Sequence, residues 1–231
     1  MAEAACHAGR NVQEIGLIAV SKTFPLSDIQ IAMAAGQMDF GENRVEEALE
    51  KMTVQAGAGG PQPRWHLIGH VQSRKARETA GRFHLIHSVD SFKLAQKLNA
   101  HCPPATPQAI LLECNVSGEA SKDGFAVAGW EHDAAIREAF FAQVAPMLAL
   151  SNLRVQGLMT IAPIVESPAE ARPFFASLRA LRDALRERVP QGDWRHLSMG
   201  MTDDFPAAIA EGATLIRVGR AIFGGRLANS R

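Results

Sequence analysis

Lys22 has the type and the position of a reactive residue. It closely follows the apolar run Leu17-Ile18-Ala19-Val20, which predicts a buried strand that ends at the lysine. A lysine held at the end of such a strand is partly desolvated, and desolvation favours the neutral amine. A neutral amine can bind an aldehyde covalently as a Schiff base. On this stretch alone, the simpler interpretation is preferred: Lys22 marks the end of a strand and points to solvent.

Two segments near the end of the sequence have the features of an anion site. Ser198-Met199-Gly200 precedes a predicted helix that begins at Asp203, and Arg217-Val218-Gly219 ends the last predicted strand. Backbone N–H groups at a helix N-terminus attract anions, and glycine lets an anion approach the backbone closely. Either segment alone is a weak signal. Together they make a phosphate site a working hypothesis.

The elements that would position these residues alternate between strands and helices. Apolar runs predict eight strands, at 17–22, 38–42, 65–69, 85–89, 109–116, 154–159, 195–198 and 214–218. Amphipathic patterns predict the helices between them. Eight such units favour a single (β/α)8 TIM barrel, an α/β fold that takes up residues 1–231 as one domain. Residues 1–12 are expected to form a short N-terminal helical extension.

Some helix starts are predicted from capping residues. Ser27 with Gln30, and Ser167 with Glu170, have the spacing of a capping box. Pro173 lies deeper in the second of these helices than proline prefers. That helix is therefore expected to begin later or to bend.

A barrel of this kind carries its active site at the carboxyl ends of its strands and often binds phosphate after strands seven and eight. Lys22 shares strand parity with Val20, and Arg217 shares it with Gly219. Both side chains are therefore expected at the barrel mouth. The polar stretch 117–124 is too long for a tight connection and is expected to overhang a site.

A lysine for an aldehyde beside a cradle for phosphate fits a phosphorylated aldehyde, and pyridoxal 5'-phosphate (PLP) is the obvious case. If the Arg217 guanidinium meets the pyridine nitrogen, it stays protonated and keeps that nitrogen unprotonated. The ring is then a poor electron sink. This favours carriage of the cofactor or a limited set of reactions.

Composition argues against several other classes of protein. The 24 basic residues balance 24 acidic ones, so no net field favours nucleic acid or an anionic membrane. No apolar run is long enough to span a membrane, and residues 1–16 lack the pattern of a signal peptide, so a cytoplasmic location is expected. The three cysteines lack CxxC spacing, so neither a disulfide framework nor a metal site is expected.

Seven segments carry a resemblance to a known family. They are Val20-Ser21-Lys22-Thr23, Phe40-Gly41-Glu42-Asn43, Trp65 to Gly69 with Gln72, Asn115 to Phe125, Gly157-Leu158-Met159-Thr160, Leu197 to Met201, and Arg217-Val218-Gly219. In this order, across residues 8–226, they resemble the pyridoxal phosphate homeostasis proteins, whose fold is similar to the barrel domain of alanine racemase. So many segments in order are jointly very specific.

The resemblance implies PLP as the cofactor and Lys22 as its Schiff-base lysine. The other implied cofactor residues are Asn43 and Met159 in the pocket, Ser198, Gly200 and Gly219 at the phosphate, and Arg217 at the pyridine nitrogen. It also implies a protein that buffers PLP and delivers it to PLP-dependent apoenzymes, without an established turnover reaction. A monomer is expected.

The sequence departs from the family pattern at four positions. Phe24 stands where a second lysine is common, and His70 and Arg74 stand where proline and asparagine are more usual. These three departures put in doubt how the cofactor enters and leaves the protein. They do not put its binding in doubt. Arg220 replaces a small hydroxyl residue, so the phosphate contact there is expected to come from a guanidinium.

Two enzymatic alternatives stay open. One is a PLP-dependent racemase or decarboxylase of the same barrel fold, but a two-base racemase of the alanine racemase type needs a tyrosine opposite the lysine, and the chain has none. The other is an aldolase-like lysine enzyme without PLP. It would need a buried acid–base pair, which the sequence does not reveal.

Other polar residues are given structural roles. His66 and His70 are four apart, but one falls on a strand and the other in a loop, so packing and rim roles are favoured over a metal pair. Glu119, Lys122 and Asp123 are polar enough to be solvated loop residues. Only the resemblance places these three near the site.

Overall fold

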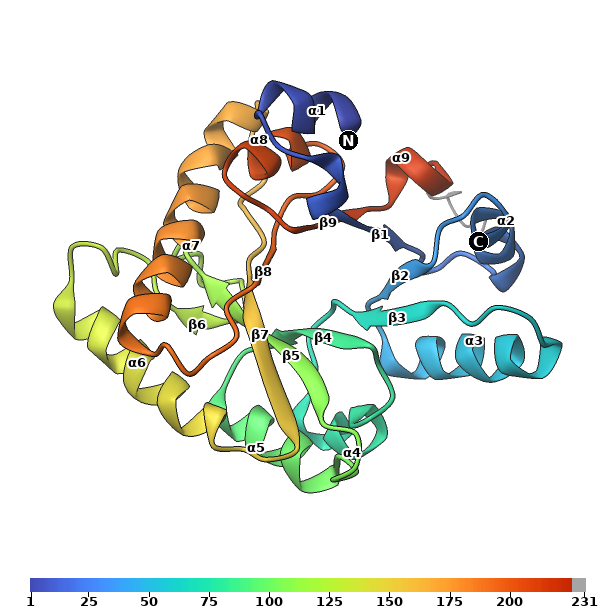
Figure 1. Ribbon diagram of the computed structural model, residues 1–231, viewed down its shortest axis with the longest axis horizontal. Coiled ribbons are helices and arrows are strands. Elements are labelled where there is room, and N and C mark those ends of the chain that lie inside the picture. Colours follow the sequence, from blue (N-terminus) through green and yellow to red (C-terminus); the bar gives the residue numbers. More distant parts are fainter. Residues whose placement is uncertain (226–231) are drawn as a thin grey trace.

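The computed structural model describes residues 1–225, in which eight parallel strands close into a barrel (Figure 1). Neighbouring strands follow the order β4, β3, β2, β1, β9, β8, β7, β5, and β5 pairs with β4 to close the ring. The bounds are Gly16–Val20 (β1), Asp39–Glu42 (β2), Arg64–Leu67 (β3), Leu85–Val89 (β4), Gln108–Asn115 (β5), Leu153–Met159 (β7), His196–Ser198 (β8) and Leu215–Val218 (β9). The predicted (β/α)8 barrel is confirmed.

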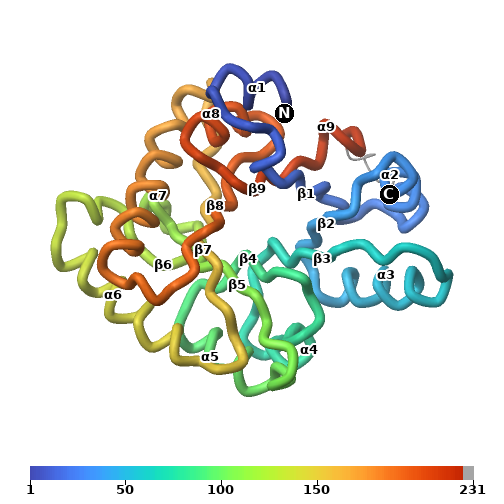
Figure 2. Tube along the Cα trace, viewed as in Figure 1, coloured from blue at the N-terminus to red at the C-terminus, as the bar shows by residue number. Residues whose placement is uncertain are grey.

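Helices lie outside the ring of strands (Figure 1). Their bounds are Leu26–Ala34 (α2), Val45–Ala58 (α3), Ala76–Thr79 (α4), Phe92–His101 (α5), Ala134–Leu148 (α6), Pro168–Arg188 (α7), Phe205–Ala210 (α8) and Arg220–Phe223 (α9), with a 3-10 turn at Ser73–Lys75 (η2). Figure 2 shows the chain following the ring in sequence order, so that the first strand lies beside the last. This closure pairs β1 with β9 in parallel and brings the chemistry of both strand ends together.

The main apolar core lies between the strands and the helices. Phe40, Leu67 and Ile110 on the strands are fully buried and belong to one cluster with helix residues such as Leu98 and Phe175. Successive strand residues point to opposite faces, so the residues beside these apolar ones point into the barrel. The helix-facing positions therefore stabilise the fold and leave the inward positions for other roles.

The interior of the barrel is partly polar. Its apolar part is a separate small cluster of Leu85, Leu111 and Met159. Such barrels are usually filled with branched apolar side chains, and buried polar groups need hydrogen-bond partners. Here other inward positions on the strands carry buried polar side chains, namely those of His66, His87, Glu113, Ser198 and Arg217.

The predicted start of α2 is wrong, whereas the predicted start of α7 at Ser167 is confirmed. Helix α2 begins at Leu26 with Pro25 as its N-cap, so Ser27 lies inside the helix and forms no capping box. At α7, Ser167 is the N-cap residue, but its hydroxyl lies 2.8 Å from the Glu170 carboxylate and caps no backbone N–H. Helix α7 also continues through Pro173 without a later start.

The N-terminal extension contains a helix, Ala2–His7 (α1), and a 3-10 turn, Val12–Glu14 (η1). Between them, Arg10 Nη1 donates to the carbonyls of Ile209 and Ala213, at 3.0 and 2.6 Å. These bonds tie the extension to the end of α8 and the loop that follows it. No helix within residues 1–225 is both long enough and apolar enough to cross a lipid bilayer.

Candidate functional site

A cavity of about 620 Å³ lies at the carboxyl ends of β1 and β9. Four predicted site residues line it: Lys22, Arg217, Gly219 and Arg220. Lys22 comes two residues after the end of β1, and Gly219 directly follows β9. The pairing of these two strands therefore explains why residues almost 200 positions apart in the sequence meet at one site.

The backbone on both sides of Lys22 is held by helix α3. Lys51 Nζ donates to the Ser21 carbonyl at 3.0 Å, and the Thr23 N–H donates to Glu47 Oε1 at 2.6 Å. Thr23 has a φ of 68°, in the left-handed region that a β-branched residue rarely adopts. The two bonds clamp this strained turn and fix the backbone from which the Lys22 side chain extends.

The clamp is anchored by a buried carboxylate. Glu42 Oε1 accepts from Ser21 Oγ at 2.7 Å and from Lys51 Nζ at 2.8 Å. Burial raises the pKa of Glu42 even though both partners oppose the rise. Burial also acts to raise the pKa of Glu47. The hydrogen bonds from Lys51 and the Thr23 N–H outweigh this effect and lower the pKa. Lys51 therefore joins two carboxylates and the turn at Lys22 into one unit.

Arg217 is oriented by two hydrogen bonds inside the barrel. It is only 4% exposed. Its Nη1 donates to Ser198 Oγ at 2.6 Å and its Nη2 to the Thr160 carbonyl at 2.8 Å. Burial lowers the pKa of Arg217 to about 10, against the opposing charges of Glu113 and Asp204, so the guanidinium is protonated at neutral pH. A fixed positive charge therefore lines the cavity.

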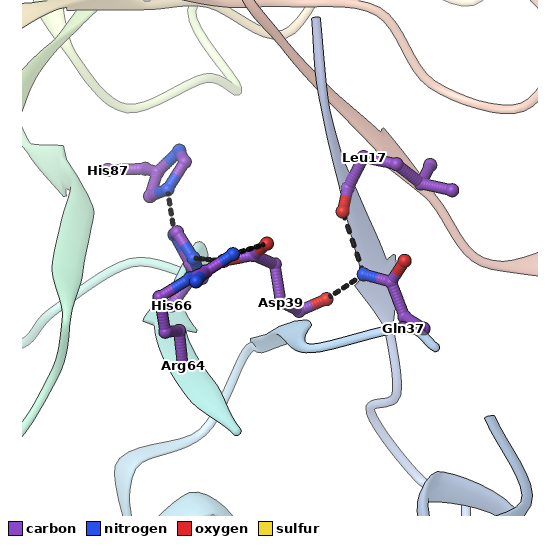
Figure 3. Close-up of polar contacts among 6 residues, drawn as sticks. All are labelled: Leu17, Gln37, Asp39, Arg64, His66 and His87. Atoms are coloured by element: carbon purple, nitrogen blue, oxygen red, sulfur yellow. Dashed lines mark hydrogen bonds and ion pairs between the residues drawn. The ribbon is translucent and has the colours of Figure 1, made fainter. Parts of the chain in front are cut away.

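A chain of hydrogen bonds runs from Arg217 through the barrel interior to Asp39. Ser198 Oγ lies 2.8 Å from His87 Nδ1, His87 Nε2 lies 3.0 Å from His66 Nδ1, and His66 Nε2 lies 3.1 Å from Asp39 Oδ1. Figure 3 shows the Asp39 end, where Arg64 also binds the carboxylate and Gln37 bridges the carbonyls of Asp39 and Leu17. We call Arg217, Ser198, His87, His66 and Asp39 the barrel relay.

The chemistry at the ends fixes the direction of the relay. Burial opposes the charge of Asp39, but hydrogen bonds from Arg64 and His66 outweigh it and hold the pKa of Asp39 well below its usual range. Asp39 therefore only accepts, and His66 donates to it through Nε2. At the other end, Ser198 Oγ already accepts from Arg217, so its hydroxyl hydrogen is available for His87 Nδ1. Burial keeps the pKa of His87 well below its usual range, so His87 is neutral, carries its single ring hydrogen on Nε2 and donates it to His66 Nδ1.

The predicted phosphate residues fall into two groups. Gly219 is the N-cap residue of α9, and Arg220 begins that helix and forms an ion pair with Asp203, which also lines the cavity. Ser198 and Gly200 are buried and are not part of the cavity lining. Gly200 has a φ of 93°, and a Cβ there would come within 2.6 Å of Ala208 Cβ in α8. Gly200 is therefore required for helix packing, whatever its role toward phosphate.

Asn43 and Met159 lie apart from the Lys22 cavity. Asn43 lines a second cavity, of about 210 Å³, and Met159 is fully buried in the interior cluster with Leu85 and Leu111. Their roles as pocket residues stay predictions. Phe24, where the family often has a lysine, lines the Lys22 cavity and stacks on Phe223 with ring centroids 5.0 Å apart.

The relay histidines His66 and His87 and the buried acid Glu113 are functional candidates that no sequence motif predicts. One signal was available: each occupies an inward parity position on a predicted strand, with His66 and Glu113 between helix-facing apolar residues and His87 between Ile86 and Ser88. Parity within the closed barrel, rather than a motif, would have pointed to these three residues.

The fold and the site define a class of protein. The family described as "Alanine racemase, N-terminal domain" matches residues 6–227, and the chain belongs to that family of barrels. Within it, the chain is 44% identical over 225 residues to the pyridoxal phosphate homeostasis protein of Pseudomonas aeruginosa, with 97% of this chain and 90% of the relative covered. The chain is thus a member of the pyridoxal phosphate homeostasis protein family, as its motifs predicted.

Solved structures agree with this placement. PipY of Synechococcus elongatus PCC7942, solved with PLP bound, is 37% identical with a TM-score of 0.79, covering 96% of this chain and 99% of PipY. Alanine racemase of Clostridium difficile 630 is 14% identical with a TM-score of 0.66, covering 98% of this chain and 56% of the racemase. The second likeness concerns the fold alone.

Proposed function

We propose that this protein binds PLP in the Lys22 cavity and contributes to intracellular PLP homeostasis without catalytic turnover. One observation carries the proposal: a single cavity is lined by an amine, a buried guanidinium and a glycine–arginine pair at a helix start. The names of the relatives and the PLP bound to PipY support the same cofactor. The proposed carrier is a cytoplasmic monomer whose recipients are PLP-dependent apoenzymes.

The residues present fit this cofactor. Lys22 would hold the aldehyde covalently, Arg217 would face the pyridine nitrogen, and Gly219 with Arg220 would hold the phosphate. A volume of about 620 Å³ lies within the roughly 300–1,000 Å³ of typical cofactor sites. When bound, PLP supplies an electrophilic aldehyde conjugated to an electron-accepting ring.

Arg217 favours carriage over catalysis. Its guanidinium is protonated at neutral pH and is held by Ser198 and Thr160 before any ligand arrives. It can donate a hydrogen bond to a ring nitrogen but does not deliver a proton to it. The Ser198 hydroxyl donates its hydrogen bond to His87. A donor to phosphate from Ser198 would therefore have to be its backbone N–H.

The absence of tyrosine from the sequence weighs against a racemase with a lysine–tyrosine pair of bases. Incubation of the PLP-loaded protein with single-enantiomer amino acids tests the point directly. We expect the enantiomer to persist over hours. Rapid exchange to the other enantiomer would replace the carrier proposal with the enzymatic alternative.

The attachment site is tested by borohydride reduction in the presence of PLP, followed by peptide mapping. We expect the label on Lys22 in the native protein and its loss in Lys22→Ala. Lys122→Ala is the matched control, because Lys122 lines the neighbouring cavity at the same end of the barrel. Label on Lys122 or on the buried Lys51 of the native protein would contradict the assignment.

A further inference from the structure

A second cavity, of about 210 Å³, lies at the same end of the barrel as the Lys22 cavity. Its lining includes Asn43 after β2, Glu113 near the end of β5, and Lys122 and Asp123 from the loop 117–124. None of these residues lines the Lys22 cavity. Residues of this loop therefore line a cavity separate from the lysine, and the expectation that the loop overhangs a functional site stays a prediction.

Glu113 is a buried acid that faces this cavity. It is 7% exposed, and within residues 1–225 its carboxylate has neither a hydrogen bond nor an ion pair. Burial, with a smaller effect of Asp123, raises the pKa of Glu113 to about 7, while Arg217 opposes the rise. The carboxylate is thus largely withdrawn from water and gains no donor from the described residues, although its oxygens keep some access to solvent.

Asn43, another residue of the lining, adds a second unpaired acceptor. Its Oδ1 is buried and has no hydrogen-bond partner among the described residues. Its backbone packs closely against Gly69, where an added Cβ would lie 2.4 Å from the Asn43 carbonyl oxygen. Each unpaired buried acceptor costs about 1–3 kcal/mol. Two such acceptors in one small cavity call for a ligand that donates hydrogen bonds.

The loop over the cavity adds a positive group and is firmly held. Asn115 Nδ2 donates to the Glu119 carbonyl at 2.9 Å, and Asn115 Oδ1 accepts from the Gly118 N–H at 2.9 Å. Farther along, the short strand Phe125–Ala126 (β6) pairs with β5. The loop thus presents the Lys122 ammonium, which is paired with Glu119, to the cavity. The lining therefore combines unpaired acceptors with one cation.

We propose that this cavity binds a small α-amino acid as its zwitterion. The ammonium group donates to the Glu113 carboxylate and to Asn43 Oδ1, and the ligand carboxylate faces the Lys122 ammonium. The volume of about 210 Å³ is below that of drug-sized sites, which restricts the side chain to a small one. The site goes beyond the proposed PLP binding and does not depend on it.

A divalent cation is the other chemistry that acidic groups attract here. His70, Asp90 and Asp123 place one ligand atom each within 4.8 Å of one another, and His70 Nδ1 already lies 3.2 Å from Asp90 and 3.3 Å from Asp123. That group includes neither Glu113 nor Asn43, so a cation bound there would leave both buried acceptors unpaired. An ammonium group that donates to both satisfies them, and we therefore favour the amino acid.

The test uses the cofactor-free full-length protein in a chelator-treated buffer, so it is independent of PLP. Isothermal titration with glycine and L-alanine is compared with N-acetyl-L-alanine, which lacks the ammonium group. We expect saturable binding of the free amino acids and at least tenfold weaker binding of the acetylated one. We also expect Glu113→Gln to weaken L-alanine binding at least tenfold.

Glu138→Gln, an acid on the outer helix α6, is the matched control and should bind L-alanine like the native protein. Thermal melting of each variant shows whether it is folded, and Lys122→Met gives a second, independent test in which L-alanine binding falls at least threefold. Equal binding of N-acetyl-L-alanine, unchanged binding by a folded Glu113→Gln, or no binding of either amino acid would overturn the proposal. The proposal would also be overturned if the native protein bound calcium or magnesium but not L-alanine, and if Glu113→Gln abolished that metal binding.

Discussion

At the scale of single residues, burial inside the barrel decides the charge of Glu113. Its pKa rises from an ordinary value of 4.5 to about 7, first through burial and then through Asp123, with Arg217 acting in the opposite direction. The folded protein therefore binds this proton more tightly than the unfolded chain does. The cost to stability is absent below about pH 4.5, grows as the pH rises, and is complete above about pH 7.

Replacement of Glu113 should reveal this cost. We expect Glu113→Gln to have a free energy of unfolding in urea about 1–3 kcal/mol higher than that of the native protein at pH 8. Near pH 4 the two free energies should be equal. Glu138→Gln, at an exposed ion pair with Arg188, should change stability by less than about 1 kcal/mol at either pH. A gain that is equal at pH 4 and pH 8 would show that the ionisation of Glu113 is not its cause.

His87 is the central residue of the barrel relay. His87→Leu removes the acceptor for Ser198 and the donor to His66, so the Ser198 hydroxyl that holds the Arg217 Nη1 group is no longer oriented. We expect a stability loss of about 1–3 kcal/mol and PLP binding at least threefold weaker. A 15N spectrum of the cofactor-free protein should show His66 protonated on Nε2 alone in the native chain and on a mixture of nitrogens in the variant.

His84 offers the control for this prediction. Its ring lies 5.3 Å from that of His66, but it has no hydrogen bond in the relay. His84→Leu should therefore leave the His66 tautomer and the PLP affinity unchanged. His87→Asn keeps an acceptor near Ser198 and should recover part of the affinity. A His66 tautomer that is unaffected by His87→Leu would contradict the assigned direction of the relay.

The candidate site could be predicted only in part at this scale. Lys22 and Arg217 were recognised because strand parity and the closure of the barrel brought them to one end. Parity places His66, His87 and Glu113 inside the barrel in the same way, but it does not predict their roles, because those roles depend on neighbours from other strands. His87 touches Ser198, 111 positions away, and no local pattern reports such a contact.

At the scale of elements, α3 controls the turn that carries Lys22. Lys51→Met removes the bond to the Ser21 carbonyl and leaves Glu42 buried without its charge partner. We expect a loss of about 3–5 kcal/mol in urea unfolding. The double variant Lys51→Met with Glu42→Gln should recover most of that loss, because no buried charge remains unpaired.

Lys75 is the matched control for Lys51. It pairs with Glu46 and Glu78 at the surface, where ion pairs contribute about 0–1 kcal/mol. Lys75→Met should therefore have little effect on stability. If Lys51→Met and Lys75→Met lose the same free energy of unfolding, burial of the Lys51 network does not explain the loss in Lys51→Met.

The order of elements was predictable, whereas several of their ends were not. All eight barrel strands arise where apolar runs predicted them, because burial between helices and barrel favours continuous apolar runs. The capping box at Ser27 failed because Pro25, with its fixed φ, is the N-cap residue of α2, two residues before Ser27. The short strand β6 was missed because its two residues pair only after the loop 117–124 has folded back onto β5.

At the scale of the whole molecule, the barrel brings two cavities to one end and places a charge pair between them. Arg217 lines the Lys22 cavity, Glu113 lines the smaller one, and each affects the ionisation of the other. The barrel relay connects Arg217 to Asp39 at the opposite end of the barrel. A ligand bound in one cavity can therefore change the affinity of the other cavity through the charges of Glu113 and Arg217 alone, without movement of the backbone.

This arrangement predicts coupling between PLP and an amino acid. An ammonium group beside Glu113 favours its ionised form, and the new carboxylate attracts the Arg217 guanidinium, which then donates less strongly to the pyridine nitrogen. We expect saturating L-alanine to weaken PLP binding at least threefold near pH 7. Because binding free energies are linked, PLP must weaken L-alanine binding by the same factor.

Equilibrium titrations in both orders measure the two factors. Glu113→Gln should bring both close to one, while Glu138→Gln should not. Coupling that persists in Glu113→Gln would show that the two ligands meet directly in one cavity and do not communicate through the Glu113–Arg217 pair.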